Sequence, residues 1–366
     1  MNPCPVDISV LEALGVSRVI PFAQGMSGAK VFRCEHSSGG SLVLRVWSPE
    51  LTEPRLSEIT RLMTVIRSEL PSLVPQVFPL QPLALSSMVK PPAATELDRL
   101  GSTIGLHESL STQTLWSHCD AGYWQLVELM PGEPLPEGAG EDCIMAGVDA
   151  LCRLHAAMSW FGQKREMPLA IRSRLRRLDQ VHDILGKDLA VGRSLEAREL
   201  LSQAVVNAIS IWNQNAVRMK RKLFSQLTSD SSQPMLTHYV LRDIHRENLL
   251  FHDGEPSGFF DFDAVRVDTP WADLARWLGS FAVTDQADDS LWSEACERFA
   301  LKHSVLEPGD IEWGHGFSRR LHEATSWISL GNWLVWLCVE KRRFAVPAEV
   351  VANRVNRLAA TVASIA

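Results

Sequence analysis

Residues 241–263, LRDIHRENLLFHDGEPSGFFDFD, decide the fold that we expect for this chain. They contain two short apolar runs, Asn248–Phe251 and Gly258–Phe262, joined by the turn sequence His252-Asp253-Gly254. Apolar runs on both sides of an Asp-Gly turn are typical of a β-hairpin. The sequence therefore predicts two antiparallel strands here, with polar side chains gathered at one end of the pair.

Three of those polar side chains suggest a chemistry. Asn248 begins the first predicted strand and Asp261 lies within the second, so pairing of the strands brings them close together. A carboxylate inside an apolar strand is costly to bury without a cation or hydrogen-bond donors. Amide and carboxylate oxygens are ligands that suit Mg²⁺. Asp243, placed before the first strand, is then positioned to accept a proton from an incoming hydroxyl.

The same stretch resembles the catalytic core of the aminoglycoside phosphotransferase and choline kinase superfamily, the protein-kinase-like small-molecule kinases. The usual pattern there is H-G-D-x-H-x-x-N, an apolar strand with I-D-F-D or I-D-W-E, and a D-P-x-x-D-L-A segment. This chain has Leu241-Arg-Asp-Ile-His-Arg-Glu-Asn248, then Phe260-Asp-Phe-Asp263, then Asp268-Thr-Pro-Trp-Ala-Asp-Leu-Ala275. It departs from the pattern at Leu241 and Arg242, which replace the His-Gly pair before the catalytic aspartate.

The resemblance implies a two-lobed, protein-kinase-like α+β fold, with a small antiparallel-sheet N-lobe and a larger, mainly helical C-lobe. Residues 1–130 would bind the nucleotide, and residues 131–366 would hold the catalytic and substrate-binding groups. The implied cofactors are ATP and Mg²⁺. The implied function is ATP-dependent phosphorylation of a hydroxyl on a small molecule that resembles an aminoglycoside, choline or homoserine. The alternative, motivated by Leu241, is a non-catalytic nucleotide-binding pseudokinase or scaffold.

The resemblance also assigns the catalytic residues. Asp243 would orient and deprotonate the acceptor hydroxyl. Asn248 and Asp261 would hold Mg²⁺, with Asp263 assisting or bracing them. A protein kinase is less favoured, because only about a dozen residues separate Asp261 from Asp273 and cannot contain the activation segment on which a peptide docks.

A glycine-rich turn near the N-terminus is the first candidate for nucleotide binding. Gly25, Ser27 and Gly28 allow main-chain N–H groups to approach a phosphate closely. In the following strand, strict alternation places Val43 and Arg45 on one face. The resemblance assigns Arg45 to the α- and β-phosphates and Val43 to the roof over adenine. The alternative is a surface arginine on an edge strand.

A helix follows this strand, with Thr52 as its N-cap and Pro54 in its first turn. Glu58 flanks the apolar stripe of that helix and is expected to reach Arg45. In the kinase architecture this glutamate holds the phosphate-binding cation in place. A solvated Glu58 and a pairing of Arg45 with Glu53 are the alternatives.

The apolar strand 123–130 ends at Pro131-Gly132, which predicts a boundary between lobes. It resembles the family's hinge, where main-chain groups near Glu128 and Met130 would bind the adenine edge. Residues 80–122 show no sustained period. From residue 142 onward the pattern predicts helices at about 144–158, 172–187, 194–226, 270–281, 289–303, 309–340 and 347–364.

For three features of the helical part we expect a structural role and not a catalytic one. His155 is expected to be a packed core histidine and not a catalyst. Asp273 is expected to cap or brace the catalytic loop. The last feature is a row of arginines, read as a solvated helix face or alternatively as a basic rim for an anionic substrate: Arg172, Arg174, Arg176 and Arg177.

Composition excludes several classes of function. A chain of 366 residues, 46% of them hydrophobic, can bury a large core in two lobes. A net charge of -7 provides no basic field for nucleic acid. The N-terminus lacks the basic flank of a signal peptide, and the most apolar run, 327–339, is too short for a membrane span. Seven cysteines without a C-x-x-C pair indicate reduced thiols and a cytoplasmic protein, whose oligomeric state the sequence leaves open.

Overall fold

The computed structural model describes residues 4–22, 29–80, 114–188, 199–281, 287–344 and 346–366. The chain forms two compact units, Met1–Pro131 and Gly132–Ala366, and the division lies one residue from the boundary expected at residue 130. Gly132 has φ +99°, and a Cβ there would lie 2.4 Å from the main-chain oxygen of Phe251, so only glycine fits. The expected α+β class, with an antiparallel sheet in the first unit and mainly helices in the second, is confirmed.

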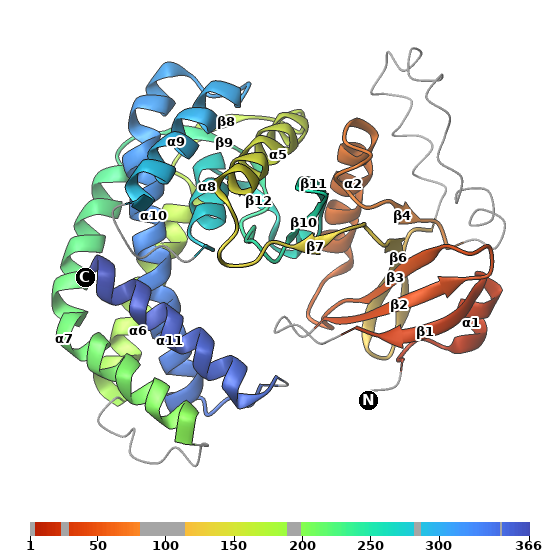
Figure 1. Cartoon of the computed structure of the whole chain (residues 1–366), viewed down its shortest axis with the longest axis horizontal. Coiled ribbons are helices and arrows are strands. Elements are labelled where there is room, and N and C mark those ends of the chain that lie inside the picture. Colours follow the sequence, from red (N-terminus) through yellow and green to blue (C-terminus); the bar gives the residue numbers. More distant parts are fainter. Residues whose placement is uncertain (1–3, 23–28, 81–113, 189–198, 282–286, 345) are drawn as a thin grey trace. The chain divides into compact units, whose positions relative to one another are not determined.

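In its described residues, the first unit is a six-stranded antiparallel sheet with helices α1 and α2 (Figure 1). The sheet order is β1-β2-β3-β6-β4, with β5 paired to β6. Its elements are α1 (Ile8–Ala13), β1 (Val16–Pro21), β2 (Lys30–His36), β3 (Ser41–Val46), α2 (Glu53–Glu69), β4 (Val77–Phe78), β5 (Ser117–Cys119) and β6 (Gly122–Glu128).

The alternation predicted for β3 is present. Leu42, Leu44 and Val46 are buried in the core of the first unit, whereas Val43 and Arg45 are only partly buried on the opposite face. Strand geometry explains this, because successive side chains point to opposite faces. Thr52 is the N-cap of α2, as expected.

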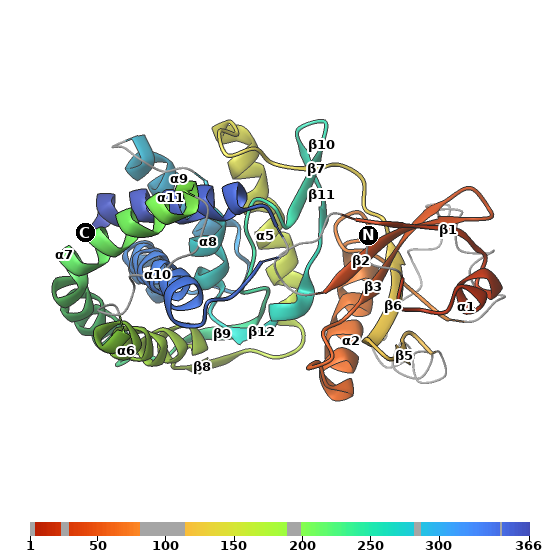
Figure 2. The same cartoon turned by 90° about the horizontal axis from the view of Figure 1, so that it is seen from below.

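The second unit combines two small sheets with long helices (Figures 1 and 2). Strands β10 and β11 form the predicted hairpin, β10 also pairs with β7, and β9 lies between β8 and β12. Helix α10 packs against α6, α7 and α11. The elements are β7 (Glu133–Pro134), α5 (Glu141–Ser159), β8 (Lys164–Glu166), α6 (Leu169–Asp188), α7 (Glu199–Asp230), β9 (Met235–Val240), β10 (Leu249–His252), β11 (Glu255–Phe259), η3 (Phe262–Ala264), β12 (Arg266–Asp268), α8 (Pro270–Leu278), α9 (Ala287–Lys302), α10 (Pro308–Leu334), η4 (Val335–Val339) and α11 (Ala348–Ile365).

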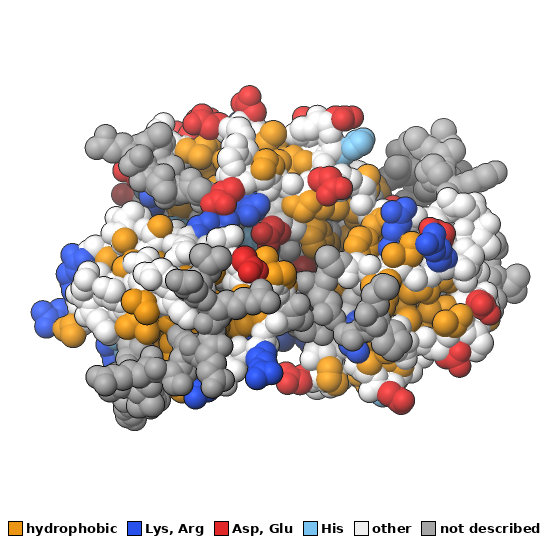
Figure 3. Space-filling model, turned by 60° about the horizontal axis from the view of Figure 1, so that its bottom comes forward, with side chains coloured by type: hydrophobic (Ala, Val, Ile, Leu, Met, Phe, Trp, Pro, Cys, Tyr) orange, Lys and Arg blue, Asp and Glu red, His pale blue; other side chains and the backbone are white. Residues whose placement is uncertain are grey.

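The predicted helices of this unit are all present, and the one expected at 309–340 ends in a π-helical turn, η4. The expected start of α7 at residue 194 lies outside the described residues. None of the helices in the described part of the chain combines the length and apolar character that a membrane crossing needs. On the face drawn in Figure 3, acidic and basic side chains are interspersed among the described residues.

The reading of the α6 arginines as a solvated face is wrong for two of the four. Arg174 donates to Thr325 Oγ1 at 2.8 and 2.9 Å, and Arg177 donates to Asn332 Oδ1 at 2.7 Å. Both acceptors belong to α10, so these arginines join two helices, while Arg172 and Arg176 are exposed. Burial lowers the pKa of Arg174 to about 10, which leaves it charged near neutral pH.

A close helix contact supports the site described below. Gly147 of α5 lies under the indole of Trp277 on α8, where an added Cβ would be 2.1 Å from Cζ2. The indole Nε1 donates to the Ile144 main-chain oxygen at 3.0 Å, which fixes the ring against α5. Only glycine allows the two helices this approach.

We predict that Gly147→Ala lowers the free energy of unfolding by about 1–3 kcal/mol, because the extra methyl overpacks the contact with Trp277. The control is Gly186→Ala, an exposed glycine of α6 whose added Cβ would meet nothing within 4 Å. That variant should be unchanged or gain up to about 1 kcal/mol from helix propensity. Urea denaturation followed by tryptophan fluorescence measures both; equal stability of the two variants would contradict the packing argument.

Candidate active site

The segment between β9 and β10, residues 241–248, is fastened at its start by a buried carboxylate. Asp273 Oδ2 accepts from the Leu241 N–H at 2.8 Å, and Oδ1 accepts from the Arg242 N–H at 2.6 Å. The Asp273 side chain is fully buried, and its Oδ2 also lies 3.0 Å from Nε2 of His155, which is equally buried. Asp273 therefore braces this loop, and His155 is a core residue, as both were expected to be.

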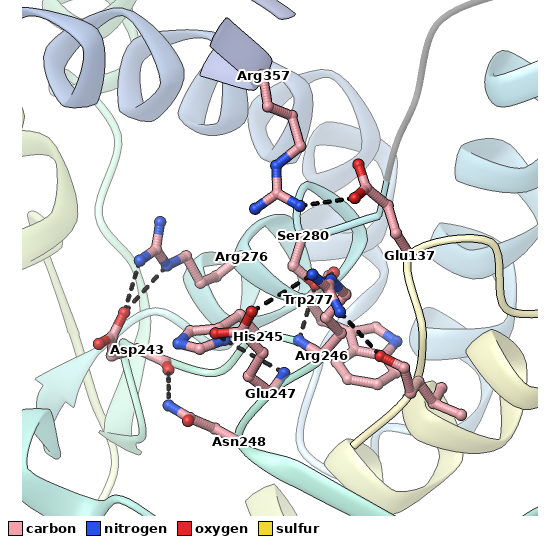
Figure 4. Close-up of polar contacts among 11 residues, drawn as sticks. Glu137, Asp243, His245, Arg246, Glu247, Asn248, Arg276, Trp277, Ser280 and Arg357 are labelled. Atoms are coloured by element: carbon pink, nitrogen blue, oxygen red, sulfur yellow. Dashed lines mark hydrogen bonds and ion pairs between the residues drawn. The ribbon is translucent and has the colours of Figure 1, made fainter. Parts of the chain in front are cut away.

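One face of α8 holds the loop at two further points (Figure 4). Arg276, three residues after Asp273, donates to Asp243 Oδ1 from Nη2 at 2.7 Å and from Nε at 3.2 Å. Ser280, just beyond the helix, accepts from the Arg246 N–H at 2.9 Å. Spacings of three and seven residues put these groups on the same side of a helix, so one rigid element positions the main chain and Asp243 together.

Asp243 is a partly exposed carboxylate of this loop, with 43% of its side chain accessible to solvent. Arg276 takes its Oδ1, and no described residue contacts Oδ2. His245, two residues on, is partly buried: burial lowers its pKa, the Asp243 charge raises it and the Arg276 charge lowers it again. Asp243 thus offers one clamped and one open oxygen.

Arg242 occupies a conformation that favours glycine, the residue of the family pattern at this position. Its φ is +67°, in the left-handed region, which costs a side-chain-bearing residue about 1–2 kcal/mol. Its Nε lies 3.1 Å from Oδ2 of Asp268, a fully buried carboxylate. Burial raises the pKa of Asp268, while the N–H groups of Ala170 and Thr269 and the Arg242 charge lower it. This ion pair offsets the strain, so the loop keeps its path without glycine.

Asn248 and the chain next to Asp261 lie at the open end of the hairpin, and a shared metal site there stays a prediction. Asn248 lies directly before β10; its Nδ2 donates to the main-chain oxygen of Asp243 at 2.9 Å, and its main-chain oxygen accepts from the Phe260 N–H at 3.1 Å. The amide group is therefore oriented, with its Oδ1 directed away from Asp243. Asp261 follows Phe260 and adjoins it.

The expectation that Asp261 lies inside the strand is wrong. Strand β11 ends at Phe259, and Asp261 is a partly buried residue with φ +66° that begins the 3₁₀ turn η3. Aspartate tolerates the left-handed conformation better than most residues, because its short polar side chain bonds locally. The carboxylate is therefore presented by a turn and not by a pleated strand. Asp263 lies within η3 and is also partly buried.

The candidate nucleotide residues of the first unit remain predictions. The guanidinium of Arg45 lies over the Trp47 ring, 4.1 Å from its centre, on the partly exposed face that it shares with Val43. Glu58 pairs with Arg55 at 2.6 Å, and its expected pairing with Arg45 stays a prediction. Gly25, Ser27 and Gly28 lie outside the described residues.

The predicted hinge residues end β6. The Glu128 carboxylate pairs with Arg67 at 2.9 Å, and its main-chain N–H donates to the Gln76 oxygen at 2.8 Å. That N–H is thus engaged within the sheet, which leaves the Glu128 carbonyl and the main chain of buried Met130 as candidate contacts for a base edge.

Sequence reasoning missed Arg276, although a signal for it exists. It lies one helical turn after Asp273, so a residue expected to brace the loop already marks the helix face on which the next contact occurs. Arg276 is the only described residue that forms an ion pair with Asp243.

The sequence profile of the phosphotransferase enzyme family matches residues 18–305. The chain belongs to this family. No curated protein sequence matches it. Solved structures share its fold. A spectinomycin phosphotransferase, solved with ADP and spectinomycin, is 11% identical with a TM-score of 0.58 and coverage of 98% of both chains. A macrolide 2'-phosphotransferase from Brachybacterium faecium is 12% identical, with a TM-score of 0.52 and coverage of 96% of this chain and 95% of the other.

An ethanolamine kinase from Plasmodium vivax is also similar, with 11% identity, a TM-score of 0.53 and coverage of 99% of this chain and 84% of the other. At these identities the likeness establishes the kinase-like fold alone. It confirms the two-lobed α+β class that the three motifs implied.

The Asp273 carboxylate generates a stability prediction. Asp273→Asn should lower the free energy of unfolding by at least about 1.5 kcal/mol, because an amide has one acceptor oxygen where the carboxylate serves three donors. Asp253→Asn is the matched control: Asp253 is 91% exposed in the hairpin turn and has a left-handed φ that asparagine also accepts. Urea denaturation should place the control within about 0.5 kcal/mol of wild type. Equal stability of the two variants would show that Asp273 does not fasten the loop.

Proposed function

We propose that the chain transfers the γ-phosphoryl group of ATP to a hydroxyl of a small molecule. The observation that carries this proposal is the state of Asp243, with Oδ1 clamped by Arg276 and Oδ2 open, beside the Asn248 and Asp261 pair. A general base must be held rigidly and still have a lone pair for the incoming proton. This arrangement meets both requirements.

The residues at the open end of the hairpin fit a magnesium ion. The Asn248 amide is turned by its bond to the Asp243 main chain, and Asp261 adjoins Phe260, which pairs with Asn248. Asn248 Oδ1 and the Asp261 carboxylate would hold the ion, with Asp263 assisting or bracing. Hard oxygen donors of this kind suit Mg²⁺, which neutralises the charge of the phosphates when bound.

The other proposed residues position the acceptor hydroxyl and the nucleotide. Asp243 Oδ2 accepts the proton of the acceptor hydroxyl as its oxygen attacks phosphorus, and Arg276 keeps the carboxylate in line. In the first unit, Arg45 would hold the α- and β-phosphates with Glu58 in support, and Val43 would cover adenine. The turn with Gly25, Ser27 and Gly28 would cradle the phosphates, and the main chain at Glu128 and Met130 would bind the base.

The alternative is a nucleotide-binding protein without catalysis, motivated by Leu241. Its side chain is 2% exposed, and the bond that fixes the loop comes from its main-chain N–H and not from its side chain. Replacement of the family's histidine therefore leaves the brace through Asp273 in place. This favours the catalytic reading.

Side chains of both charges surround Asp243. Arg276 pairs with Asp243 directly, and Arg354 of α11 feels the charges of Asp243, Glu247, Arg276 and Arg357. Arg357 in turn pairs with Glu137 at 2.7 Å. Because carboxylates offset the arginines, these charges select neither a cationic nor an anionic acceptor. The net charge of -7 favours no nucleic-acid partner, and the seven free thiols support a reducing cytoplasm.

Replacing the proposed base separates catalysis from binding. Asp243→Asn should leave the affinity for Mg·ATP nearly unchanged while lowering turnover on the true acceptor by at least about a hundredfold, the usual scale of general-base loss. Calorimetry measures the first quantity and ADP release the second, with Asp253→Asn as the control that keeps wild-type values. Undiminished turnover in Asp243→Asn would exclude this role. Absence of turnover in wild type with every acceptor would favour the scaffold.

Removing a proposed metal ligand should act on nucleotide binding instead. Asp261→Asn should abolish the Mg²⁺-dependent part of ATP affinity with little loss of stability, because asparagine also adopts a left-handed φ and leaves no buried charge unpaired. Titrations of ATP with and without Mg²⁺ test this, again beside Asp253→Asn. An unchanged Mg·ATP affinity in a folded variant would refute the assignment.

A further inference from the structure

Three histidines lie together in the core of the second unit, behind the loop that Asp273 fastens. His155 comes from α5, His238 from β9, and His303 directly follows α9. Their exposed fractions are 0%, 0% and 4%. One nitrogen of each ring lies within 4.8 Å of one nitrogen of both others. Segments distant in the sequence therefore direct three imidazoles to one buried point.

The hydrogen bonds of two of the rings fix which nitrogen carries the proton. His155 Nε2 faces the Asp273 carboxylate at 3.0 Å, and His238 Nδ1 faces the Tyr239 main-chain oxygen at 2.6 Å. Both partners are acceptors, so these two nitrogens donate. The opposite nitrogens, His155 Nδ1 and His238 Nε2, then present lone pairs.

The protein itself satisfies one of these two lone pairs, since His155 Nδ1 is hydrogen-bonded to His303 Nε2 at 3.3 Å. Among the described residues, neither His238 Nε2 nor His303 Nδ1 has a hydrogen-bond partner, although both are buried. An unsatisfied buried polar atom is costly, and two in one cluster indicate that a further group belongs there.

The arrangement also fits a bound metal ion. Nitrogens bound tetrahedrally to zinc at about 2.0–2.1 Å lie about 3.3 Å apart, which is the distance between His155 Nδ1 and His303 Nε2. Metal-binding histidines commonly donate their other N–H to a carboxylate or a main-chain oxygen, as His155 and His238 do here. An ion bound by all three rings would satisfy His238 Nε2 and leave only the His303 Nδ1–H without a described partner.

We propose that His155, His238 and His303 form a buried site for a divalent transition-metal ion of the kind that imidazole nitrogens bind, with zinc as the ion to test. The three rings supply three nitrogens and leave one coordination position for water. The site is separate from the magnesium ligands Asn248 and Asp261. Through His155 and Asp273 it would stabilise the start of the catalytic loop, a structural role that does not depend on the proposed phosphotransfer.

The test is the metal content of the chain, prepared without a histidine tag and dialysed against a weak chelator. Wild type should retain about one zinc per chain by mass spectrometry. His238→Gln should retain less than a tenth of that amount. The control, His315→Gln at an exposed position of α10, should match wild type. Stoichiometric zinc that is equal in all three proteins, or no stoichiometric zinc in wild type, would overturn the proposal.

A second measurement tests the site without any variant, in case His238→Gln does not fold. X-ray absorption on the wild-type protein reports the ligand atoms directly, and it should show nitrogen or oxygen scatterers at about 2.0–2.1 Å without sulfur. Sulfur scatterers at about 2.3 Å would place the ion on the cysteines and contradict the histidine site. Addition of Zn²⁺ to metal-stripped wild type should also raise Tm, since an ion that binds only the folded chain stabilises it. An unchanged Tm at saturating Zn²⁺ would count against the site.

Discussion

The candidate site depends on the hydrogen bonds that the buried Asp273 carboxylate accepts from the catalytic loop. It accepts from the main-chain N–H groups of Leu241 and Arg242 and lies against His155, all without contact with solvent. A buried charge is stable only when such donors surround it, so removing any of them exposes the full cost of burial. Because the donors are main-chain groups at the start of the loop, any other path of the loop would leave the Asp273 charge buried without them. The loop is therefore held in one conformation. The positions of Asp243 and Asn248, which follow in the same loop, depend on this conformation.

The hairpin and the order of helices were predictable, because their signals are local. A turn sequence between two apolar runs and a helical period need only neighbouring residues. The brace by Asp273 was also predicted, from a motif whose order along the chain is specific. Arg276 was not predicted: its place one helical turn after Asp273 marks the right helix face, but composition and period do not show that a residue of this face pairs with a loop 33 residues earlier. The π-helical turn η4 likewise has no signal in the pattern that continues α10.

The errors have physical causes as well. Apolar neighbours on both sides of Asp261 favour a strand, but the chain turns there, because aspartate accepts a left-handed φ that phenylalanine resists. Arg174 and Arg177 resemble a solvated face because arginine is usually exposed, yet hydroxyl and amide oxygens on α10 satisfy them. The replacement of the family's His-Gly pair by Leu241 and Arg242 has a physical explanation as well. The loop needs two main-chain donors and one left-handed residue there, and other side chains are compatible when an ion pair to Asp268 supports them.

The account is tested most directly by incubating the wild-type chain with Mg·ATP and a mixture of hydroxyl-bearing metabolites that includes cationic, neutral and anionic members. Phosphorus NMR and mass spectrometry then identify what becomes of the γ-phosphoryl group. The account predicts a new phosphate monoester formed in step with ADP. Bound nucleotide that yields no ADP, or ADP accompanied only by inorganic phosphate, would contradict it.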